Sequence, residues 1–315
     1  MSVTSSSPES QRERTDCRMS PLRREYLIVY CIAGAASSTA TVDRIAWFHV
    51  PKTGSSFANT LMHLANTSLP ANAFIQTKAK DLKEMVREFP MDTWFRIKFW
   101  EPWRRSRHHG FGGIGDHTAI SAAVHTQFAG HFFGLFRQPV NRAQSAYAYF
   151  CPSTECNYTF AAYSQRIVGT VTKMLSGQQY GLACHVVPAR REWPCRTKLL
   201  PDVETAVNRL NSFAFVGMTE DYPRSICLLH AMFPAAPCLA GEFKNTNPTD
   251  YHNSKLKTKG SATAANHFYP DEYDSRVWAR AKEIYAIALT RYRITRARCK
   301  AICPGASDTF DQVAF

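Results

Sequence analysis

The chain has 315 residues, which is enough to bury a sizeable hydrophobic core without cross-links or metals. Its 45% hydrophobic and 20% charged residues are ordinary for a globular protein and exclude collagen-like, coiled-coil and largely disordered chains. The formal net charge of +13 at pH 7 indicates an anionic partner such as a nucleotide, a nucleic acid or an acidic glycan, without choosing among them.

The N-terminal part of the chain contains one uninterrupted apolar run, Tyr26 to Ala36, which follows two arginines and precedes small residues. This order is typical of a secretory signal peptide, and the run is shorter than the roughly 20 apolar residues that span a bilayer. We therefore expect residues 1–41 to form a polar leader with a signal peptide, or a signal anchor that holds the chain on a membrane. Met19 would start a leader of conventional length, and a buried first strand is the alternative for the run.

Eight of the ten cysteines follow residue 42, and they occur as sequence neighbours: Cys151 with Cys156, Cys184 with Cys195, Cys227 with Cys238, and Cys299 with Cys303. An even number of cysteines after a signal-like run predicts disulfides and an oxidising compartment, the Golgi lumen or the cell exterior, although it fixes no connectivity. Zinc is disfavoured because the sequence contains no Cys-x-x-Cys pair. The sequons at Asn66 and Asn157 are compatible with a glycoprotein of the same compartment.

Strand-like and helix-like segments alternate along the rest of the chain, which predicts an α/β fold. We expect a single domain over 42–300, with a mainly parallel central sheet flanked by helices, and a C-terminal tail at 301–315. The expected strands are 44–50, 130–136 and 211–216, with another near 95–100, and the expected helices are 57–65, 139–150, 222–232 and 271–293. The segment 243–267 is polar and irregular.

The first chemical feature is Pro51-Lys-Thr-Gly-Ser-Ser56, which lies where the first expected strand gives way to a helix. Helix N-termini offer free backbone N–H groups and a positive dipole end, so a turn of small residues at this place can wrap a phosphate. Lys52 adds a cation. Because this lysine precedes the glycine, the loop departs from the usual nucleoside-triphosphate loop, and an ordinary capped turn is the alternative.

The second feature combines Arg137, at the end of an expected strand, with Ser145 in the helix that follows. An arginine at the carboxyl end of a parallel strand points into the crevice where open α/β sheets bind ligands. Its planar fork suits a second phosphate, which the serine hydroxyl can share.

Both features resemble the motifs of sulfotransferases that use 3′-phosphoadenosine 5′-phosphosulfate (PAPS), especially the Golgi carbohydrate type of the heparan sulfate 2-O-sulfotransferases. The resemblance spans residues 44–293 and implies a P-loop-like architecture, similar to that of nucleotide kinases, with no metal. It implies that the 5′-phosphosulfate is held by Lys52, Thr53, Gly54, Ser55 and Ser56, and the 3′-phosphate by Arg137 and Ser145. Gln138 stands where the family usually has aspartate, which should weaken a structural contact more than phosphate binding.

Sulfuryl transfer to a hydroxyl requires a base for the hydroxyl proton and a cation near the departing phosphate. The resemblance implies a histidine about twenty positions before Arg137, where this sequence has His117, and implies that Lys52 also steadies the bridging oxygen. With an unperturbed imidazole, the pKa of this base would be near 6.5. His108, His109 and Glu101 are the alternative bases.

Three further segments carry weaker signals. The stretch 100–109 mixes aromatic rings with cations, so Arg104, Arg105, His108 and His109 are candidates for acceptor binding, with a solvated loop as the alternative. Lys257 lies where family members often carry a loop that closes over the nucleotide, and exposed lysines are the alternative. The Gly-x-Gly-x-x-Gly pattern at 110–115 does not predict a dehydrogenase, because it lies far from the preceding strand and an arginine takes the place of the ribose-binding acid.

The sequence therefore predicts a metal-independent sulfotransferase that moves a sulfuryl group from PAPS to a glycan or another hydroxyl acceptor, with no nucleic acid as partner. Two alternatives remain: an atypical P-loop phosphotransferase, and a non-catalytic binder of acidic glycans or nucleic acid. A kinase would need a magnesium-binding acid after a strand, whereas the expected strand ends give Arg137 and Gly217.

Overall fold

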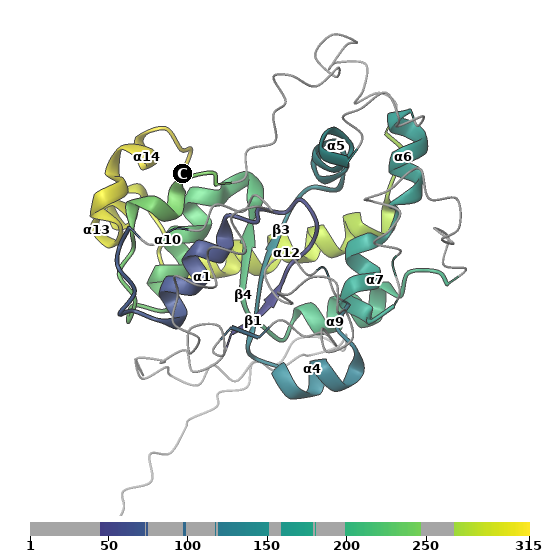
Figure 1. The fold of residues 1–315 in the computed structure, drawn as a ribbon, viewed down its shortest axis with the longest axis horizontal. Coiled ribbons are helices and arrows are strands. Elements are labelled where there is room, and N and C mark those ends of the chain that lie inside the picture. The colour runs from purple at the N-terminus through teal and green to yellow at the C-terminus, as the bar shows by residue number, and fades with distance from the viewer. Residues whose placement is uncertain are drawn as a thin grey trace, which may run out of the picture. The chain divides into compact units, whose positions relative to one another are not determined.

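The computed structural model describes residues 45–72, 74, 97–98, 117, 119–150, 159–178, 180, 199–246 and 268–315 (Figure 1). The predicted leader and its apolar run lie outside these residues. None of the helices in the described part of the chain combines the length and apolar character needed to cross a membrane.

Four strands form one sheet in the order β2-β1-β3-β4, and every neighbouring pair is parallel. They are β1 (Ile45–Phe48), β2 (Ile97–Lys98), β3 (Phe132–Phe136) and β4 (Phe213–Met218). Every residue of β1 and β3 is buried, which explains why both read as short continuous apolar runs instead of alternating patterns. The predicted α/β fold with a parallel sheet and helices is confirmed.

Helices account for most of the remaining described chain. Those expected from the sequence are α1 (Phe57–Ala65), α5 (Pro139–Phe150), α10 (Tyr222–Met232) and α12 (Glu272–Arg291). Those not anticipated are α4 (Ala122–Phe128), α6 (Phe160–Arg166), α7 (Thr170–Ser176), α9 (Val203–Leu210), α13 (Arg296–Ile302), α14 (Ser307–Asp311) and the 3₁₀ turns η2 (Thr219–Asp221), η3 (Ala240–Phe243) and η4 (Pro304–Ala306).

The hydrophobic core forms around the sheet, with aromatic rings from three strands in contact. Phe213 stacks on Phe132, with ring centroids 5.2 Å apart, and meets Phe48 edge-on at 5.7 Å. The long helix α12 packs against β4, α9 and α7 (Figure 1). Residues 301–315, expected as a tail, finish α13, form η4 and α14, and bury Phe310 completely in this core.

Two disulfides fasten the C-terminal helices to the segment around α10. Cys227 is bonded to Cys299 and Cys238 to Cys303, with Cα atoms 5.5 Å and 5.0 Å apart. Sequence neighbours among these four cysteines are therefore not bonded to each other. The reason is tertiary: Cys299 lies in α13 and Cys303 directly follows this helix, and each is bonded to a cysteine of the α10 segment. Cys151, Cys156, Cys184 and Cys195 lie outside the described residues.

The sequon at Asn66 does not offer an accessible acceptor. Asn66 follows α1 and is buried, and its Oδ1 accepts hydrogen bonds from the Ser68 backbone N–H at 3.1 Å and hydroxyl at 2.6 Å. A glycan would be attached to Nδ2 of this amide, and the burial of Asn66 leaves little room for it, so the folded geometry argues against glycosylation here. Asn157 lies outside the described residues.

Candidate active site

The order of the strands marks where a ligand should bind. The chain passes from β1 to β2 on one side and then to β3 on the other, so the connections leaving β1 and β3 diverge. In open parallel sheets, ligands bind outside the carboxyl ends of strands at such a switch point. The two segments found there are the loop 51–56 after β1 and Arg137 after β3.

The loop 51–56 has the geometry of an anion cradle. Lys52 and Gly54 both adopt left-handed backbone conformations, with φ of 68° and 100°. The Cβ of a larger residue at 54 would lie 3.2 Å from the Leu135 side chain and would be strained by that φ. Within the described part of the chain, no hydrogen bond engages the backbone N–H groups of Gly54, Ser55 and Ser56. Three successive N–H groups at a helix N-terminus favour a bound anion.

Two threonines hold this loop in place. The Thr53 hydroxyl donates to the Val50 carbonyl at 2.9 Å, and the Thr219 hydroxyl donates to the Thr53 carbonyl at 2.8 Å. Thr53 is buried and occupied by this internal bond, so it shapes the loop and does not line the cavity. Thr219 directly follows β4, so the end of a third strand helps to position the cradle.

A cavity of about 320 Å³ lies at the switch point, within the size range of small-molecule sites. Six of the predicted site residues line it: Lys52, Gly54, Ser55, Ser56, Arg137 and Ser145. Sequence reasoning missed five others: Thr219, Tyr222, Phe243, Lys244 and Asn245. The position of Thr219 at a strand end was a usable signal, whereas the other four reach the cavity only through tertiary packing.

Two cations stand side by side at this cavity. The Arg137 guanidinium donates from Nη1 to the Lys52 carbonyl at 3.1 Å, and the Lys52 ammonium lies 3.8 Å from the Tyr149 ring centroid. Burial, and secondarily repulsion from Arg137, lower the pKa of Lys52 to about 8. A negative charge in the cavity would attract both cations and so offset the cost of burying Lys52 and its repulsion from Arg137. The site therefore favours a negatively charged ligand.

His117 lies beside the loop with a defined tautomer. Its Nδ1 is 3.0 Å from the backbone carbonyl of His49, and because a carbonyl oxygen only accepts, Nδ1 carries the hydrogen and Nε2 keeps a lone pair. Burial lowers the pKa of His117 to about 4, with a smaller contribution from the Lys52 charge, although the carbonyl bond opposes the shift. The expected value near 6.5 is therefore wrong, because it assumed a solvated ring.

His117 does not line the cavity itself and reaches it through His49, which sequence reasoning missed. The two imidazole rings are 4.4 Å apart, and His49 Nε2 is 3.2 Å from the Ser55 hydroxyl oxygen of the cradle. The available signal was the place of His49 at the carboxyl end of a buried strand.

Gln138, which replaces the family's aspartate, takes part in a small structural network at the start of α5. Its backbone N–H donates to the Glu220 carboxylate at 2.9 Å, and its side-chain oxygen accepts from the Asn141 amide at 3.0 Å. The glutamine is thus held by neighbours on α5 and η2 and is not among the residues that line the cavity.

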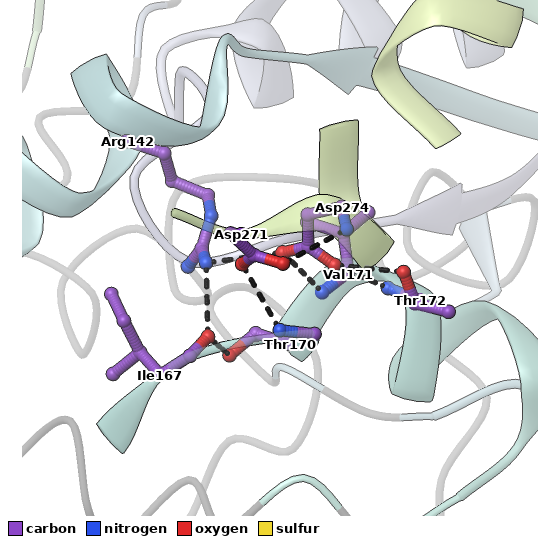
Figure 2. Close-up of polar contacts among 8 residues, drawn as sticks. Arg142, Ile167, Thr170, Val171, Thr172, Asp271 and Asp274 are labelled. Carbon is purple, nitrogen blue, oxygen red and sulfur yellow. Dashed lines mark hydrogen bonds and ion pairs between the residues drawn. The ribbon is translucent and has the colours of Figure 1, made fainter. Parts of the chain in front are cut away.

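A buried ion pair anchors the helix that carries Ser145. Figure 2 shows the Arg142 guanidinium of α5 beside the Asp274 carboxylate of α12, at 3.3 Å, with both side chains 1% exposed. Asp274 also accepts hydrogen bonds from the backbone N–H groups of Val171 and Thr172 and from the Thr172 hydroxyl, at 2.9–3.1 Å. Ser145 lies one turn beyond Arg142, so this pair fixes α5 against α7 and α12.

Asp271 completes the same buried cluster. It caps α12 by accepting from the Asp274 backbone N–H, and its other oxygen accepts from the Gly169 N–H, both at 3.0 Å. Burial and the neighbouring Asp274 carboxylate raise the pKa of Asp271 to about 7. This carboxyl group therefore changes its charge near neutral pH.

One group of side chains in the described part of the chain, His230, Cys238 and Glu242, has the spacing of a metal site. Its donors are already used. The Cys238 sulfur is bonded to Cys303, and His230 contacts the Glu242 carboxylate at 2.7 Å and the Ala236 carbonyl at 3.1 Å. These residues therefore do not fit a metal while the disulfide is intact.

The remaining predicted residues, Glu101, Arg104, Arg105, His108, His109 and Lys257, lie outside the described residues, as does the glycine pattern at 110–115. No family model, curated protein or solved structure matches the chain.

Proposed function

We propose that the chain is a sulfotransferase that moves the sulfuryl group of PAPS to a hydroxyl of an acceptor, in the first place a glycan. The observation that carries the proposal is the cavity at the β1–β3 switch point. It combines an anion cradle, formed by the free N–H groups of residues 54–56 and Lys52, with Arg137 and Ser145. A nucleotide with phosphate groups on both its 5′ and 3′ oxygens would use both groups of donors.

The transfer step assigns one role to each of two residues. The acceptor oxygen attacks the sulfur, the bond from sulfur to the 5′-phosphate oxygen breaks with its electron pair, and the hydroxyl proton moves to Nε2 of His117. His117 lies beside the cavity and not in its lining, so the proposal requires the acceptor hydroxyl to approach between the bound donor and this ring. The Lys52 ammonium stabilises the negative charge that grows on the leaving phosphate. Because burial lowers the pKa of His117 to about 4, its imidazole is neutral at pH 7 and keeps a lone pair on Nε2, although it is a weaker base than a solvated imidazole.

The phosphotransferase alternative is less well supported, because a kinase needs carboxylates that hold magnesium at the phosphates. The acids after β4 have other partners: Glu220 accepts from the Gln138 backbone and the Asn141 amide, while Asp221 accepts from the Tyr285 hydroxyl at 3.0 Å. Neither acid lines the cavity. A P-loop-like architecture is part of our proposal, and the order of strand, anion cradle and helix supports it.

The proposed setting is the secretory pathway, in the Golgi lumen or outside the cell. Two disulfides fit an oxidising compartment. The net charge of +13 is compatible with an acidic glycan as acceptor, and our proposal of a glycan sulfotransferase includes no nucleic acid as partner.

Isothermal calorimetry with adenosine 3′,5′-bisphosphate, the desulfated donor, tests the proposal against ATP with magnesium. We expect tighter binding of the bisphosphate, and a loss of about 10- to 100-fold in Arg137→Ala, the scale of one charged hydrogen-bond partner. Arg298→Ala, which removes the same charge from an exposed position on α13, is the matched control and should bind like the parent. Tighter binding of magnesium ATP would instead support the phosphotransferase, and binding of neither would refute a nucleotide site.

A further inference from the structure

His49 is a buried histidine that the proposed transfer step does not use. It directly follows β1, is 4% exposed, and lies with its ring stacked on Trp47 at 4.1 Å and tilted against His117 at 4.4 Å. Burying an imidazole at the edge of an anion cradle forfeits its hydration. Its contacts therefore identify what the ring does there.

The hydrogen bonds of His49 point to one tautomer. Nε2 is 3.2 Å from the Ser55 hydroxyl oxygen, whereas the buried Nδ1 has no hydrogen-bond partner within the described part of the chain. A neutral imidazole carries one N–H and one lone pair. With the hydrogen on Nε2, the only N–H of the ring reaches an acceptor, while the opposite tautomer would bury an unpaired N–H.

This tautomer determines what the Ser55 hydroxyl can do. When Ser55 Oγ accepts from His49, the hydroxyl hydrogen stays available to donate to another group. Ser55 lines the cavity, so that group is an oxygen of the bound anion. If Ser55 instead donated its hydroxyl hydrogen to His49 Nε2, only an oxygen lone pair would face the anion, and this contact would be repulsive.

His49 also acts on His117. Its backbone carbonyl holds the hydrogen on His117 Nδ1, and its ring covers one side of the His117 ring. The first contact leaves the lone pair on Nε2, and the second keeps water from that side of the imidazole. Any residue at position 49 retains the carbonyl, so only the ring contribution depends on the side chain.

We propose that His49 is a positioning residue that joins the anion cradle to the base: its Nε2–H sets Ser55 as a donor to the bound anion, while its ring and carbonyl hold His117 with the lone pair on Nε2. The inference deepens the proposed function and rests on it for the identity of the anion. The arrangement of the two tautomers can be measured without turnover.

Three substitutions of His49 separate these effects. His49→Phe keeps a flat ring against His117 and removes the donor to Ser55, so it should weaken adenosine 3′,5′-bisphosphate binding about 2- to 10-fold, the effect of one neutral hydrogen bond. His49→Gln places an amide N–H near the position of Nε2 and should restore most of this loss. Ser55→Ala should weaken binding at least as much as His49→Phe, and the double variant should be no weaker than Ser55→Ala alone, because His49 acts on the anion through the Ser55 hydroxyl.

His49→Ala tests the effect on the base. Without the covering ring, water reaches His117, so its pKa should rise from about 4 towards the solvated value near 6.5, whereas His49→Phe should leave it low. The pKa is read from the imidazole resonances in an NMR titration. Thermal unfolding monitored by circular dichroism verifies that the variants are folded.

Nitrogen-15 NMR of the histidine rings in the full chain gives the decisive readout, with resonances assigned from His49→Gln and His117→Asn. Hydrogens on Nε2 of His49 and Nδ1 of His117 support the inference, together with a loss of affinity in His49→Phe that is not added to the loss in Ser55→Ala. A hydrogen on Nδ1 of His49 overturns it, as does parental affinity in His49→Phe beside a weakened Ser55→Ala. Correct tautomers in a parent that binds no bisphosphate would contradict the proposed function while still supporting the positioning of His117.

Discussion

Replacing Asp274 with alanine should lower the free energy of unfolding by about 3–5 kcal/mol, the effect of leaving a buried charge without its partner. The carboxylate accepts four hydrogen bonds: from Arg142, from the Val171 backbone, and two from Thr172 (Figure 2). Its removal leaves a guanidinium that is 1% exposed without its ion-pair partner, with only the more distant Asp271 carboxyl group nearby in the described part of the chain, and uncaps the first turn of α7.

The opposite substitution, Arg142→Met, should be clearly less destabilising. Asp274 would retain its three donors from α7, and the change removes two guanidinium atoms, Nε and Nη1, that are buried without hydrogen-bond partners among the described residues. The double variant should be no less stable than Asp274→Ala alone, because the unpaired cation is then gone. The exposed pair Arg280–Glu283, at 2.8 Å, is the control, and Arg280→Ala should cost less than about 1 kcal/mol.

Urea unfolding of the four variants, followed by tryptophan fluorescence, measures these free energies. The m-value should stay constant, so that differences in midpoint report stability alone. Equal losses of stability in Asp274→Ala and Arg142→Met that add together in the double variant would show that the buried pair does not act as a unit.

Three further predictions follow from the titrating groups and the disulfides. Bisphosphate affinity should fall as pH rises through about 8, where Lys52 loses its proton, and Lys52→Arg should remove this dependence in calorimetry between pH 7 and 9; an unchanged slope would count against the cation. Between about pH 4 and 7 the folded chain holds a proton on Asp271 that the unfolded chain has lost. The free energy of unfolding should therefore decrease by up to about 1.4 kcal/mol for each unit by which the pH rises through this range. Asp271→Asn should flatten this fall in denaturant curves at pH 5 and 7, and an unaltered pH dependence would contradict the shift. Cys227→Ser with Cys299→Ser should cost about 4 kcal/mol, from the entropy of a 72-residue loop, and thiol titration of the denatured, unreduced parent should find neither cysteine reactive.

Local patterns predicted the parts of the fold and of the candidate site that depend on neighbours in the sequence. The helices at 57–65 and 222–232 were located to the residue, because each follows a buried strand and a short turn. The short helices α6 and α7 were not, because seven residues hold too few turns to make a clear periodic pattern. The disulfide partners depend on how α13 packs against α10, which no spacing reveals.

The residues of the candidate site also fall into those that local sequence patterns predict and those that depend on tertiary packing. The cradle and Arg137 could be predicted because both lie at strand ends, and parallel strands bring those ends to one edge of the sheet. The pKa of His117 and the contribution of His49 could not, because burial and ring contacts across 68 positions of chain determine both. The only sequence signal for a role of His49 was its position as a polar residue directly after a buried strand.

We propose that Arg137 recognises a 3′-phosphate in a cavity whose cradle holds the 5′-phosphate. The most direct measurement compares the affinities of adenosine 3′,5′-bisphosphate and adenosine 5′-phosphate for the parent and for Arg137→Ala by calorimetry at one salt concentration. We predict that the 3′-phosphate strengthens binding to the parent by about 10-fold or more, and that this gain largely disappears in Arg137→Ala. An equal gain in both proteins, or no gain in the parent, would contradict the account.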